Sequence, residues 1–305
     1  MVHRVWPVVL VISLAPVALS QDAAVQPLKL AAEPENQSVY ALPAPPTEKT
    51  GTNLGGLSLA TEVRYMTQHI YRGVNVTDLI SDVSGKTTSG GPNFQFEGYL
   101  SFNLDKLPHP FIGIFTNILD SDQFSNFEEV QPIIGAEWKI RPLVLTVANN
   151  TYIYPERSAA NTSDAYLKVL LDDAAILRRE KPLFSPYVLA AFDYDNYKGW
   201  YFEFGVSHDF PIENTGITLT TLANIAYVAD NDMYVQPGNP KQANTGFQHY
   251  ELGLIARYNL NQLLNVSQRF GKWNLTGYLN YTEGMDSDLR SASQLWGGGG
   301  LELRY

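Results

Sequence analysis

The sequence contains no cysteine, which excludes disulfide bridges, thiolate metal sites and thiol nucleophiles together. Charge is also scarce, because only 17% of the 305 residues are Asp, Glu, Lys or Arg, against about 25% in an ordinary soluble domain. Bases are the scarcer sign, 21 against 31 acids, and the net charge is −10. Nucleic-acid binding needs a basic surface to neutralise phosphates, so these absences argue against a nucleic-acid partner.

Long hydrophobic runs are missing as well, apart from one short stretch at the start. Residues 5–14 (VWPVVLVISL) fall short of the roughly 18 to 20 apolar residues that a membrane-spanning helix needs. They follow a weakly basic start and precede the small-residue motif Ala18-Leu19-Ser20, so residues 1–20 are expected to be a cleaved signal peptide. An uncleaved anchor is the alternative.

Residues 21–53 are rich in Ala, Pro, Glu, Gln and Thr and poor in large apolar side chains. Such a segment cannot bury enough apolar surface to offset its ordering entropy, so a disordered periplasmic leader is expected. A plug or a tether is the alternative for this segment. Residues 54–305 are expected to form the folded domain.

Many segments of the sequence alternate between apolar and polar residues. In residues 94–104 (FQFEGYLSFNL), every second residue from Phe94 is apolar or Gly, and the residues between them are Gln, Glu, Tyr, Ser and Asn. The same period of two recurs in residues 200–210, 249–258 and 273–281. This period is typical of β-strands with one apolar face.

The length of these segments favours a membrane barrel over a soluble sandwich, which also alternates. They run for about 9 to 13 residues, whereas strands of soluble proteins have a mode of about 5 to 6 and tilted membrane strands need about 9 to 11. Their apolar faces tend to begin or end on an aromatic residue, as the girdles of a membrane barrel do. We therefore predict an all-β fold, an antiparallel transmembrane up-and-down β-barrel of about 12 strands. The predicted strands are residues 57–66, 94–104, 111–119, 130–140, 143–154, 165–172, 184–195, 200–210, 216–228, 247–258, 272–281 and 295–305.

One predicted strand and two connections do not follow the simple pattern. Residues 111–119 (FIGIFTNIL) are apolar at nearly every position, so the alternation does not assign their faces. A periplasmic N-terminus makes the odd connections the long outer loops and the even ones short periplasmic turns. Two even connections, residues 173–183 and 261–271, are long enough to hold one helical turn each.

The chain ends in LWGGGGLELRY, an alternating segment that stops on an aromatic residue. Leu301, Leu303 and Tyr305 are expected on the lipid face. A terminal strand with this pattern resembles the signal that the barrel-assembly machinery recognises. The four glycines, residues 297–300, are expected to let the closing seam curve beside a lumenal Trp296. Lipid of the outer membrane and the assembly machinery are the partners this predicts.

Residues 62–78 (EVRYMTQHIYRGVNVTD) resemble the first strand and first loop of the TorF-type porins, through Tyr71, Arg72, Gly73, Thr77 and Asp78. The motifs TYIYPE and WYFEFGVSHDFPI are similar to later strands of that family. The chain departs from the family in its Pro-rich leader and in the long insert after Asp78. The resemblance implies an outer-membrane barrel with a pore, in a Gram-negative envelope. It implies no particular substrate and no catalytic residue.

The inward face of the predicted strands carries six glutamates and five bases, which are expected to line the pore: Glu62, Arg64, Glu97, Glu137, Lys139, Lys168, Glu203, Glu251, Arg257, Glu302 and Arg304. The alternative is that opposite charges merely satisfy one another in a filled barrel. Glu62 and Arg64 are expected to face Glu302 and Arg304 across the seam. Because burying so many dry charges is costly, a narrow, water-containing lumen is expected.

An outer-membrane lipid hydrolase is a less favoured alternative. It would need a Ser nucleophile and a His base on one face, but the adjacent Ser207 and His208 point to opposite faces of a strand. His249 and Glu251 share a face without a serine, and no histidine cluster suits a metal. We therefore expect no enzyme activity, no metal and no cofactor.

Acidic residues gather near the predicted mouths: Asp193, Asp195, Asp209, Asp230, Asp232, Asp286 and Asp288. Carboxylates beside low-dielectric walls raise the local concentration of cations. The sequence thus predicts a weakly cation-preferring channel for passive diffusion of small hydrophilic solutes. A plugged structural or adhesive barrel is the alternative, because the sequence does not tell whether a loop folds inward.

Overall fold

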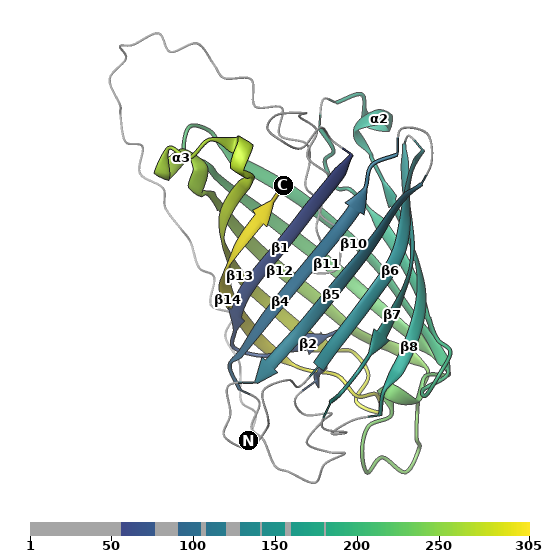
Figure 1. The fold of residues 1–305 in the computed structure, drawn as a ribbon. Helices are drawn as coiled ribbons and strands as arrows, with labels where there is room; N and C mark the ends of the chain where they lie inside the picture. The colour runs from purple at the N-terminus through teal and green to yellow at the C-terminus, as the bar shows by residue number, and fades with distance from the viewer. Residues whose placement is uncertain are drawn as a thin grey trace, which may run out of the picture. The chain divides into compact units, whose positions relative to one another are not determined.

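The computed structural model describes residues 56–76, 91–104, 108–119, 129–140, 142–155, 160–179 and 181–305. Within these ranges the chain forms one closed antiparallel barrel, in which neighbouring strands follow the order β1-β14-β13-β12-β11-β10-β9-β8-β7-β6-β5-β4 (Figure 1). The predicted signal peptide and leader lie outside the described residues.

The barrel strands coincide with the twelve predicted segments to within a few residues at each boundary, which confirms the all-β up-and-down fold. They are β1 (Leu57–Met66), β4 (Asn93–Phe102), β5 (His109–Leu119), β6 (Glu129–Ile140), β7 (Leu143–Tyr152), β8 (Thr162–Leu171), β9 (Tyr187–Asp193), β10 (Gly199–Ile212), β11 (Ile217–Ala229), β12 (Gly246–Asn259), β13 (Lys272–Gly284) and β14 (Gln294–Arg304).

The barrel closes where the last strand meets the first. β14 pairs with both β13 and β1, so neither end of the sheet is left with unpaired backbone groups. The backbone of Tyr305 exchanges two hydrogen bonds of 2.7 Å with that of Leu59, which carries the pairing to the last residue. We call this end of the barrel, where β1 begins and β14 ends, the terminal end. The opposite end, where the β1–β4 connection leaves, is the loop end.

The outer face of the barrel is apolar and the inner face is largely polar. On β14, Leu295 is 64% exposed, whereas the neighbouring Trp296, which points inward, is 5% exposed. Trp200, Phe204 and Phe210 on β10 follow the same rule, with rings exposed on the outside. An apolar outer band around a closed sheet is the arrangement that a bilayer accepts, since every strand is hydrogen-bonded on both sides.

β5 shows why its faces could not be assigned from sequence. Ile112 and Ile114 are exposed on the outer face, while Phe111 and Phe115 are buried inside the barrel. Phe111 packs there with Ile133 and other apolar side chains of the inner wall. Both faces of this strand are therefore apolar, for different reasons.

The seam between β1 and β14 is glycine-rich because its backbones and side chains approach closely. A Cβ on Gly298 would lie 2.1 Å from the carbonyl oxygen of Tyr65, and one on Gly300 would lie 2.8 Å from the Cβ of Arg64. The glycines thus make room for β1 and for the Arg64 side chain. The neighbouring Trp296 points into the lumen, as expected, and its indole donates a hydrogen bond of 3.0 Å to the hydroxyl of Thr282.

The connections carry short helices. The two long even connections each hold a helical turn, α2 (Ala174–Leu177) and α3 (Leu260–Leu264), and the second also holds the 3-10 turn η2 (Gln268–Phe270). Figure 1 shows α2 and α3 at the terminal end, together with the C-terminus. At the loop end, η1 (Asp232–Tyr234) lies in the β11–β12 connection. None of the helices in the described ranges is long and apolar enough to cross a membrane.

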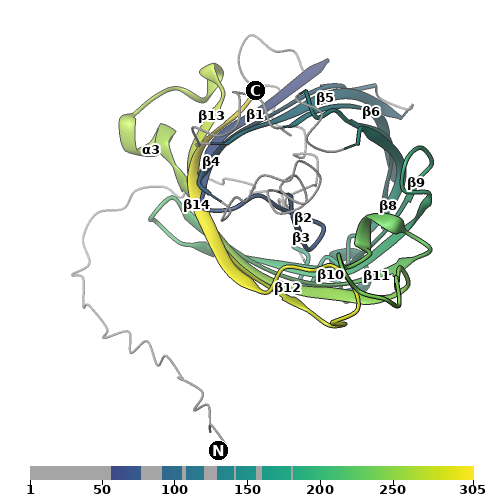
Figure 2. The ribbon, with the colours of Figure 1, turned by 90° about the horizontal axis from the view of Figure 1, so that it is seen from below.

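A small hairpin lies inside the barrel. Its strands, β2 (Ile70–Tyr71) and β3 (Val74–Asn75), belong to the β1–β4 connection, and Figure 2 shows them within the ring of barrel strands. The two residues between them, Arg72 and Gly73, have φ values of 46° and 73°. Positive φ at both central positions is typical of the type I′ turn, which suits the twist of a two-residue hairpin.

Candidate functional site: the lumen and its inward hairpin

The tip of the β2–β3 hairpin is tied to the barrel wall by a buried ion pair. Nη1 of Arg72 lies 2.6 Å from Oδ2 of Asp164 on β8, and both side chains are nearly buried. The same carboxylate accepts a hydrogen bond of 2.8 Å from the hydroxyl of Tyr152 on β7, which is also hydrogen-bonded to the hydroxyl of Tyr71. The guanidinium lies over the ring of Tyr201 on β10, 5.0 Å from its centroid.

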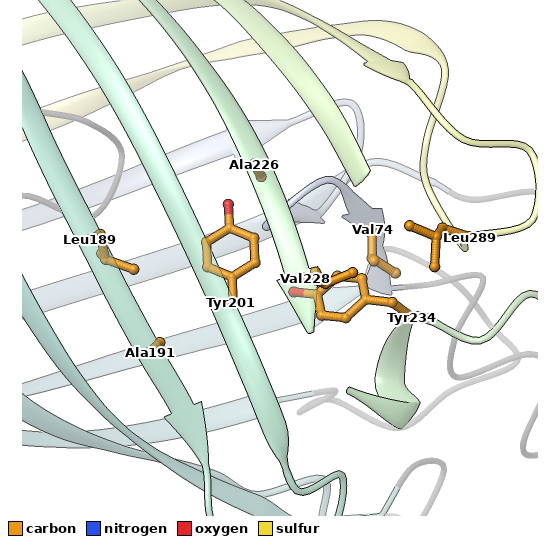
Figure 3. Close-up of a cluster of buried hydrophobic side chains, with 8 residues drawn as sticks. All are labelled: Val74, Leu189, Ala191, Tyr201, Ala226, Val228, Tyr234 and Leu289. Atoms are coloured by element: carbon orange, nitrogen blue, oxygen red, sulfur yellow. The ribbon is translucent and has the colours of Figure 1, made fainter. Parts of the chain in front are cut away.

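The other flank of the hairpin packs into an apolar cluster at the loop end. Figure 3 shows Val74 beside Tyr234 of η1 and Leu289 of the β13–β14 connection. The remaining members of the cluster come from barrel strands: Leu189, Ala191, Tyr201, Ala226 and Val228. The carbonyl of Gly73 accepts a hydrogen bond of 2.7 Å from the amide of Ala292.

Glycine is required at the second turn position for two reasons. Its φ is positive, and a Cβ there would lie 2.2 Å from Nδ1 of His249. The sequence left open whether any loop folds inward. The structure shows that the described part of the first loop does, and that it narrows the loop-end half of the lumen.

A small chamber lies beside this hairpin, in the interior of the barrel. Its lining mixes aromatic rings with amide, carboxylate and guanidinium groups. The lining residues include Arg64, Arg72, Glu97, Tyr99, Asn150, Tyr166, Glu203, Tyr278 and Trp296.

Several aromatic rings lie against glycines of the neighbouring strand. Tyr99 pairs with Gly113, and Tyr187 pairs with Gly205. A Cβ on either glycine would come within 2.4 to 2.5 Å of the partner's ring. Each ring therefore lies along the wall in the space that a side chain would fill, a recognised way of compensating glycine in a strand. The pairs reduce how far these rings project into the lumen.

The structure places all eleven predicted pore-lining residues on the inward-facing positions of their strands. Around the seam, Arg64 lies 3.3 Å from Glu97 and 3.4 Å from Glu62, and its Nε donates a hydrogen bond of 2.7 Å to Gln95. Closer to the terminal end, Glu302 lies 3.7 Å from Arg257. These charges satisfy one another, as the alternative interpretation of the sequence allowed.

The predicted network across the seam forms only in part. The register sets Glu62 opposite Glu302, but it sets Arg64 opposite Gly300. A register that set Glu62 opposite Arg304 would also have set Arg64 opposite Glu302, but Ala60 lies opposite Arg304 instead, so neither ion pair lies directly across the seam. Arg304 instead bonds Glu302 on its own strand.

The remaining predicted charges have more varied surroundings. Both carboxylate oxygens of Glu203 accept tyrosine hydroxyls at 2.5 Å, and the ammonium of Lys168 lies 4.2 Å from the centroid of the Tyr187 ring. Glu137 lies 3.9 Å from Lys139, whose side chain is 40% exposed at the terminal end of β6. Glu251 accepts a hydrogen bond of 3.0 Å from Thr282 and forms no ion pair with any described base.

Three of the acids expected at the mouths are engaged in structural contacts. Asp193 accepts hydrogen bonds from the hydroxyl of Thr162 and from backbone amides of the β9–β10 turn. Asp288 lies 2.5 Å from the ammonium of Lys241. The carboxylate of Asp209 accepts from Thr220 at 2.6 Å. These contacts leave fewer free carboxylates than the sequence suggested.

The histidines do not assemble a hydrolytic site in the part of the chain that the structure describes. Nδ1 of His208 bonds the carbonyl of Leu183 at 2.5 Å, and His249 bonds Gln248. His69 lies 3.5 Å from Glu129, and none of these histidines bonds a serine hydroxyl. Among the described residues, no group of His, Asp and Glu has the arrangement of a metal site.

The sequence did not identify Asp164, Tyr152 or the tethering role of Arg72. Arg72 stood out only as part of the motif Tyr71-Arg72-Gly73. The feature of the sequence that could have indicated this role is a charged residue at the centre of a two-residue turn flanked by apolar residues. It could not have indicated the partner, because Asp164 lies 92 residues along the chain.

No protein-family model matches the sequence, and no curated protein matches it either. Similar solved structures include the NanC porin, with 10% identity over 81% of this chain and 98% of that one and a TM-score of 0.42. Outer membrane phospholipase A from Escherichia coli shares 12% identity over 80% and 92% of the two chains, with a TM-score of 0.44. LpxR from Salmonella typhimurium shares 9% over 81% and 99%, with a TM-score of 0.39. Similarity at this level does not choose between a pore and an enzyme.

Proposed function

We propose that the protein is an outer-membrane, porin-like channel of the TorF type for passive diffusion of small hydrophilic solutes, with a weak preference for cations. The observation that carries the proposal is the contrast between an apolar outer face and a lumen lined by paired charges and a polar chamber. A polar interior occurs both in water-filled pores and in plugged barrels, and the chamber beside the hairpin favours the pore. The proposed orientation puts the terminal end in the periplasm and the loop end outside the cell.

The proposed cation preference rests on a few carboxylates. Asp230, Asp232 and Asp286 lie in loop-end connections. Inside the barrel, Glu203 and Glu251 are predicted pore-lining acids that form no ion pair with a described base. An uncompensated carboxylate in a narrow lumen attracts cations, and dissolved salt screens the effect over about 10 Å at 0.1 M.

Planar-bilayer recording of the purified protein under a salt gradient tests both parts of the proposal. We expect discrete conductance steps and a reversal potential of the cation sign that moves toward zero in high salt. Glu251→Gln should shift the reversal potential further toward zero. Glu283→Gln is the matched control, because Glu283 is bonded to the outward-facing Tyr281 near the barrel rim.

The inward hairpin favours a second candidate, a plugged structural or adhesive barrel. Its tip is held by an ion pair, two tyrosines and an apolar cluster, so it could close the lumen. Silence at every voltage would favour the plugged barrel, and an anion-selective reversal potential would contradict the proposed selectivity.

The proposed cellular partners are outer-membrane lipid and the barrel-assembly machinery. Leu301 is 42% exposed on the outer face of β14, the strand that closes the barrel. Deleting Tyr305, or replacing Leu301 and Leu303 with Asp, is expected to block insertion and leave the chain in the periplasm. Unchanged levels in the outer-membrane fraction would refute this terminal signal.

A further inference from the structure

The β12–β13 connection, residues 260–271, presents large apolar side chains to its surroundings. Leu264 is 63% exposed and Phe270 is 62% exposed, and Leu263 beside them is exposed as well. Single apolar residues at a protein surface are common, but several on one short connection mark a surface that contacts something outside the chain.

Hydrogen bonds fix the shape of this connection. The side chain of Asn261 is buried, its amide donates to the carbonyl of Gly271 at 2.9 Å, and its oxygen accepts from the amide of Trp273 at 2.6 Å. The indole of Trp273 donates to the carbonyl of Phe270 at 3.2 Å. The apolar side chains are therefore held in their exposed positions by the folded structure.

The connection lies on the lipid-facing side of the barrel. Figure 2 shows α3 outside the ring of strands, and Figure 1 shows it at the terminal end. A Cβ on Gly271 would lie 2.5 Å from Cδ1 of Leu303, which shares the outer face of β14 with Leu301. Leu301 pairs in turn with the exposed Leu275 of β13. The apolar side chains of the connection thus continue the apolar band that faces the bilayer.

The charges of the connection are all positive. The chain has a net charge of −10, yet it contains no acid between Glu251 and Glu283, a segment that holds Arg269 and Lys272. The guanidinium of Arg269 lies 5.6 Å from the centroid of the Phe270 ring and forms no ion pair with a residue that the structure describes. A base beside exposed apolar side chains is the combination that binds a membrane surface with negatively charged lipid.

The other helical connection of the terminal end, which holds α2, also combines exposed apolar and basic side chains. Ile176 and Phe184 are exposed, and so are Arg178 and Arg179. The buried Asp173 in this connection accepts hydrogen bonds from backbone amides, including that of Phe184. The combination therefore occurs twice at the end of the barrel where the chain terminates.

From the position, the apolar surface and the charge, we propose that the β12–β13 connection binds anionic phospholipid. Leu263, Leu264 and Phe270 enter the boundary between headgroups and acyl chains, and Arg269 contacts the lipid phosphate. An uncharged surface would accept any phospholipid, whereas the added base favours a headgroup with a net negative charge, such as phosphatidylglycerol. The inference rests on the proposed orientation for its assignment to the periplasmic leaflet, but the lipid contact itself does not require conduction.

The test uses the absence of cysteine from the chain. Leu264→Cys in the full-length protein gives a single thiol for a fluorescent dye, and Gln236→Cys in the exposed β11–β12 connection at the loop end is the matched control. Each labelled protein is reconstituted into vesicles of phosphatidylcholine and phosphatidylglycerol, in which one lipid or the other carries brominated acyl chains. We expect bromine to quench the dye at residue 264 and to leave the dye at residue 236 unquenched.

The selectivity for the headgroup is measured in equal mixtures of the two lipids. Brominated phosphatidylglycerol should quench the dye at residue 264 at least about twofold more strongly than brominated phosphatidylcholine. Arg269→Gln should remove this preference. Lys198→Gln is the matched control, because Lys198 is an exposed base at the loop end. Arg269→Lys keeps the charge and should keep the preference, which guards against a loss caused by misfolding.

The outcomes separate this inference from the proposed function. No quenching at residue 264 would show that the connection faces water and would overturn the inference. Equal quenching by the two lipids, or equal loss in the Arg269→Gln and Lys198→Gln variants, would overturn the anionic headgroup. A preference for phosphatidylglycerol in a protein that conducts no ions would refute the channel and leave the lipid contact standing. Conductance without the preference would refute the lipid contact and leave the channel standing.

Discussion

The two halves of the lumen are built in different ways. At the loop end, a hairpin from the first connection enters the barrel and is held by the Arg72–Asp164 pair and an apolar cluster. At the terminal end, the interior is filled by side chains of the barrel strands themselves, such as Arg257 and Glu302. The first half depends on a segment that could leave, whereas the described contents of the second belong to the barrel strands.

This difference separates permeation from stability. The loop-end half can be opened by breaking a few contacts of the hairpin, while the barrel wall stays intact. The terminal-end half cannot be opened without changing the wall, because its contents are part of the strands.

Removing the hairpin should open the loop-end half. We expect replacement of residues 68–75 by a short Gly-Ser linker to increase single-channel conductance several-fold, because the hairpin occupies the lumen cross-section there. The measurement is bilayer recording at fixed salt. A matched trim of residues 236–242, in the exposed β11–β12 connection, should leave conductance unchanged. Equal conductance in all three proteins would show that the hairpin is not the constriction.

Breaking the ion pair alone should loosen the hairpin without removing it. Arg72→Met leaves the buried Asp164 carboxylate without its cation, and unpairing a buried charge costs about 3 to 5 kcal/mol. We expect faster hydrogen exchange at the amides of residues 69–76, measured by mass spectrometry, and noisier channel openings. Asp164→Asn in the same background should restore part of the protection, since it removes the orphaned charge. Unaltered exchange would show that the apolar cluster holds the hairpin by itself.

In the terminal-end half, the wall itself should be sensitive. Gly205→Ala would place a Cβ 2.4 Å from the Tyr187 ring, and overpacking of this kind costs about 1 to 3 kcal/mol. We expect a lower free energy of unfolding in urea with lipid vesicles, and little change in conductance. Gly277→Ala is the control, because a Cβ there meets nothing within 4 Å. Equal stability of the two variants would contradict the ring-over-glycine packing.

The smallest effect is expected at the exposed pair of Lys241 and Asp288. Hydrogen bonds from Lys241 and Asn239 hold the pKa of Asp288 below its usual value, and the bond to Asp288 raises the pKa of Lys241. Because the Asp288 pKa is lowered in the folded state, any stabilisation is present above the ordinary pKa and is lost as the pH falls through the lowered one. Lys241→Ala should leave the thermal midpoint at pH 7 unchanged. A clear drop would mean that this loop contact supports the barrel.

The strands were predictable because their pattern is local. Alternation along residues 94–104 depends only on lipid outside and on water or polar groups inside. The inward and outward faces of each strand can therefore be predicted from its own residues. The pattern failed on β5, because the inward Phe111 packs with Ile133 and Ala148, and the inward Phe115 lies against the His69 ring and the Arg64 guanidinium. Where inward residues are apolar as well, the sequence no longer alternates between apolar and polar residues, and the two faces of the strand cannot be told apart.

The contents of the lumen were less predictable than its walls. That Arg64 and Glu302 point inward follows from their strands, but their partners follow from the stagger with which the barrel closes. The hairpin is harder still, because residues 70–75 are too short for a pattern and the tip bonds Asp164, 92 positions along the chain. The sequence shows that the turn carries an arginine able to form an ion pair, but it does not show which carboxylate the arginine contacts.

The hairpin also has a mechanical consequence. In the ring of strands, β9 is diametrically opposite β1, and the two strands beside β9 carry Asp164 and Tyr201, the residues that hold Arg72. The β2–β3 hairpin, which follows β1, therefore spans the interior and contacts the wall opposite β1. A hollow cylinder under uneven side pressure flattens into an ellipse, and a strut across its diameter resists that distortion. The cross-section of this barrel should accordingly stay round when the tension or thickness of the surrounding bilayer changes.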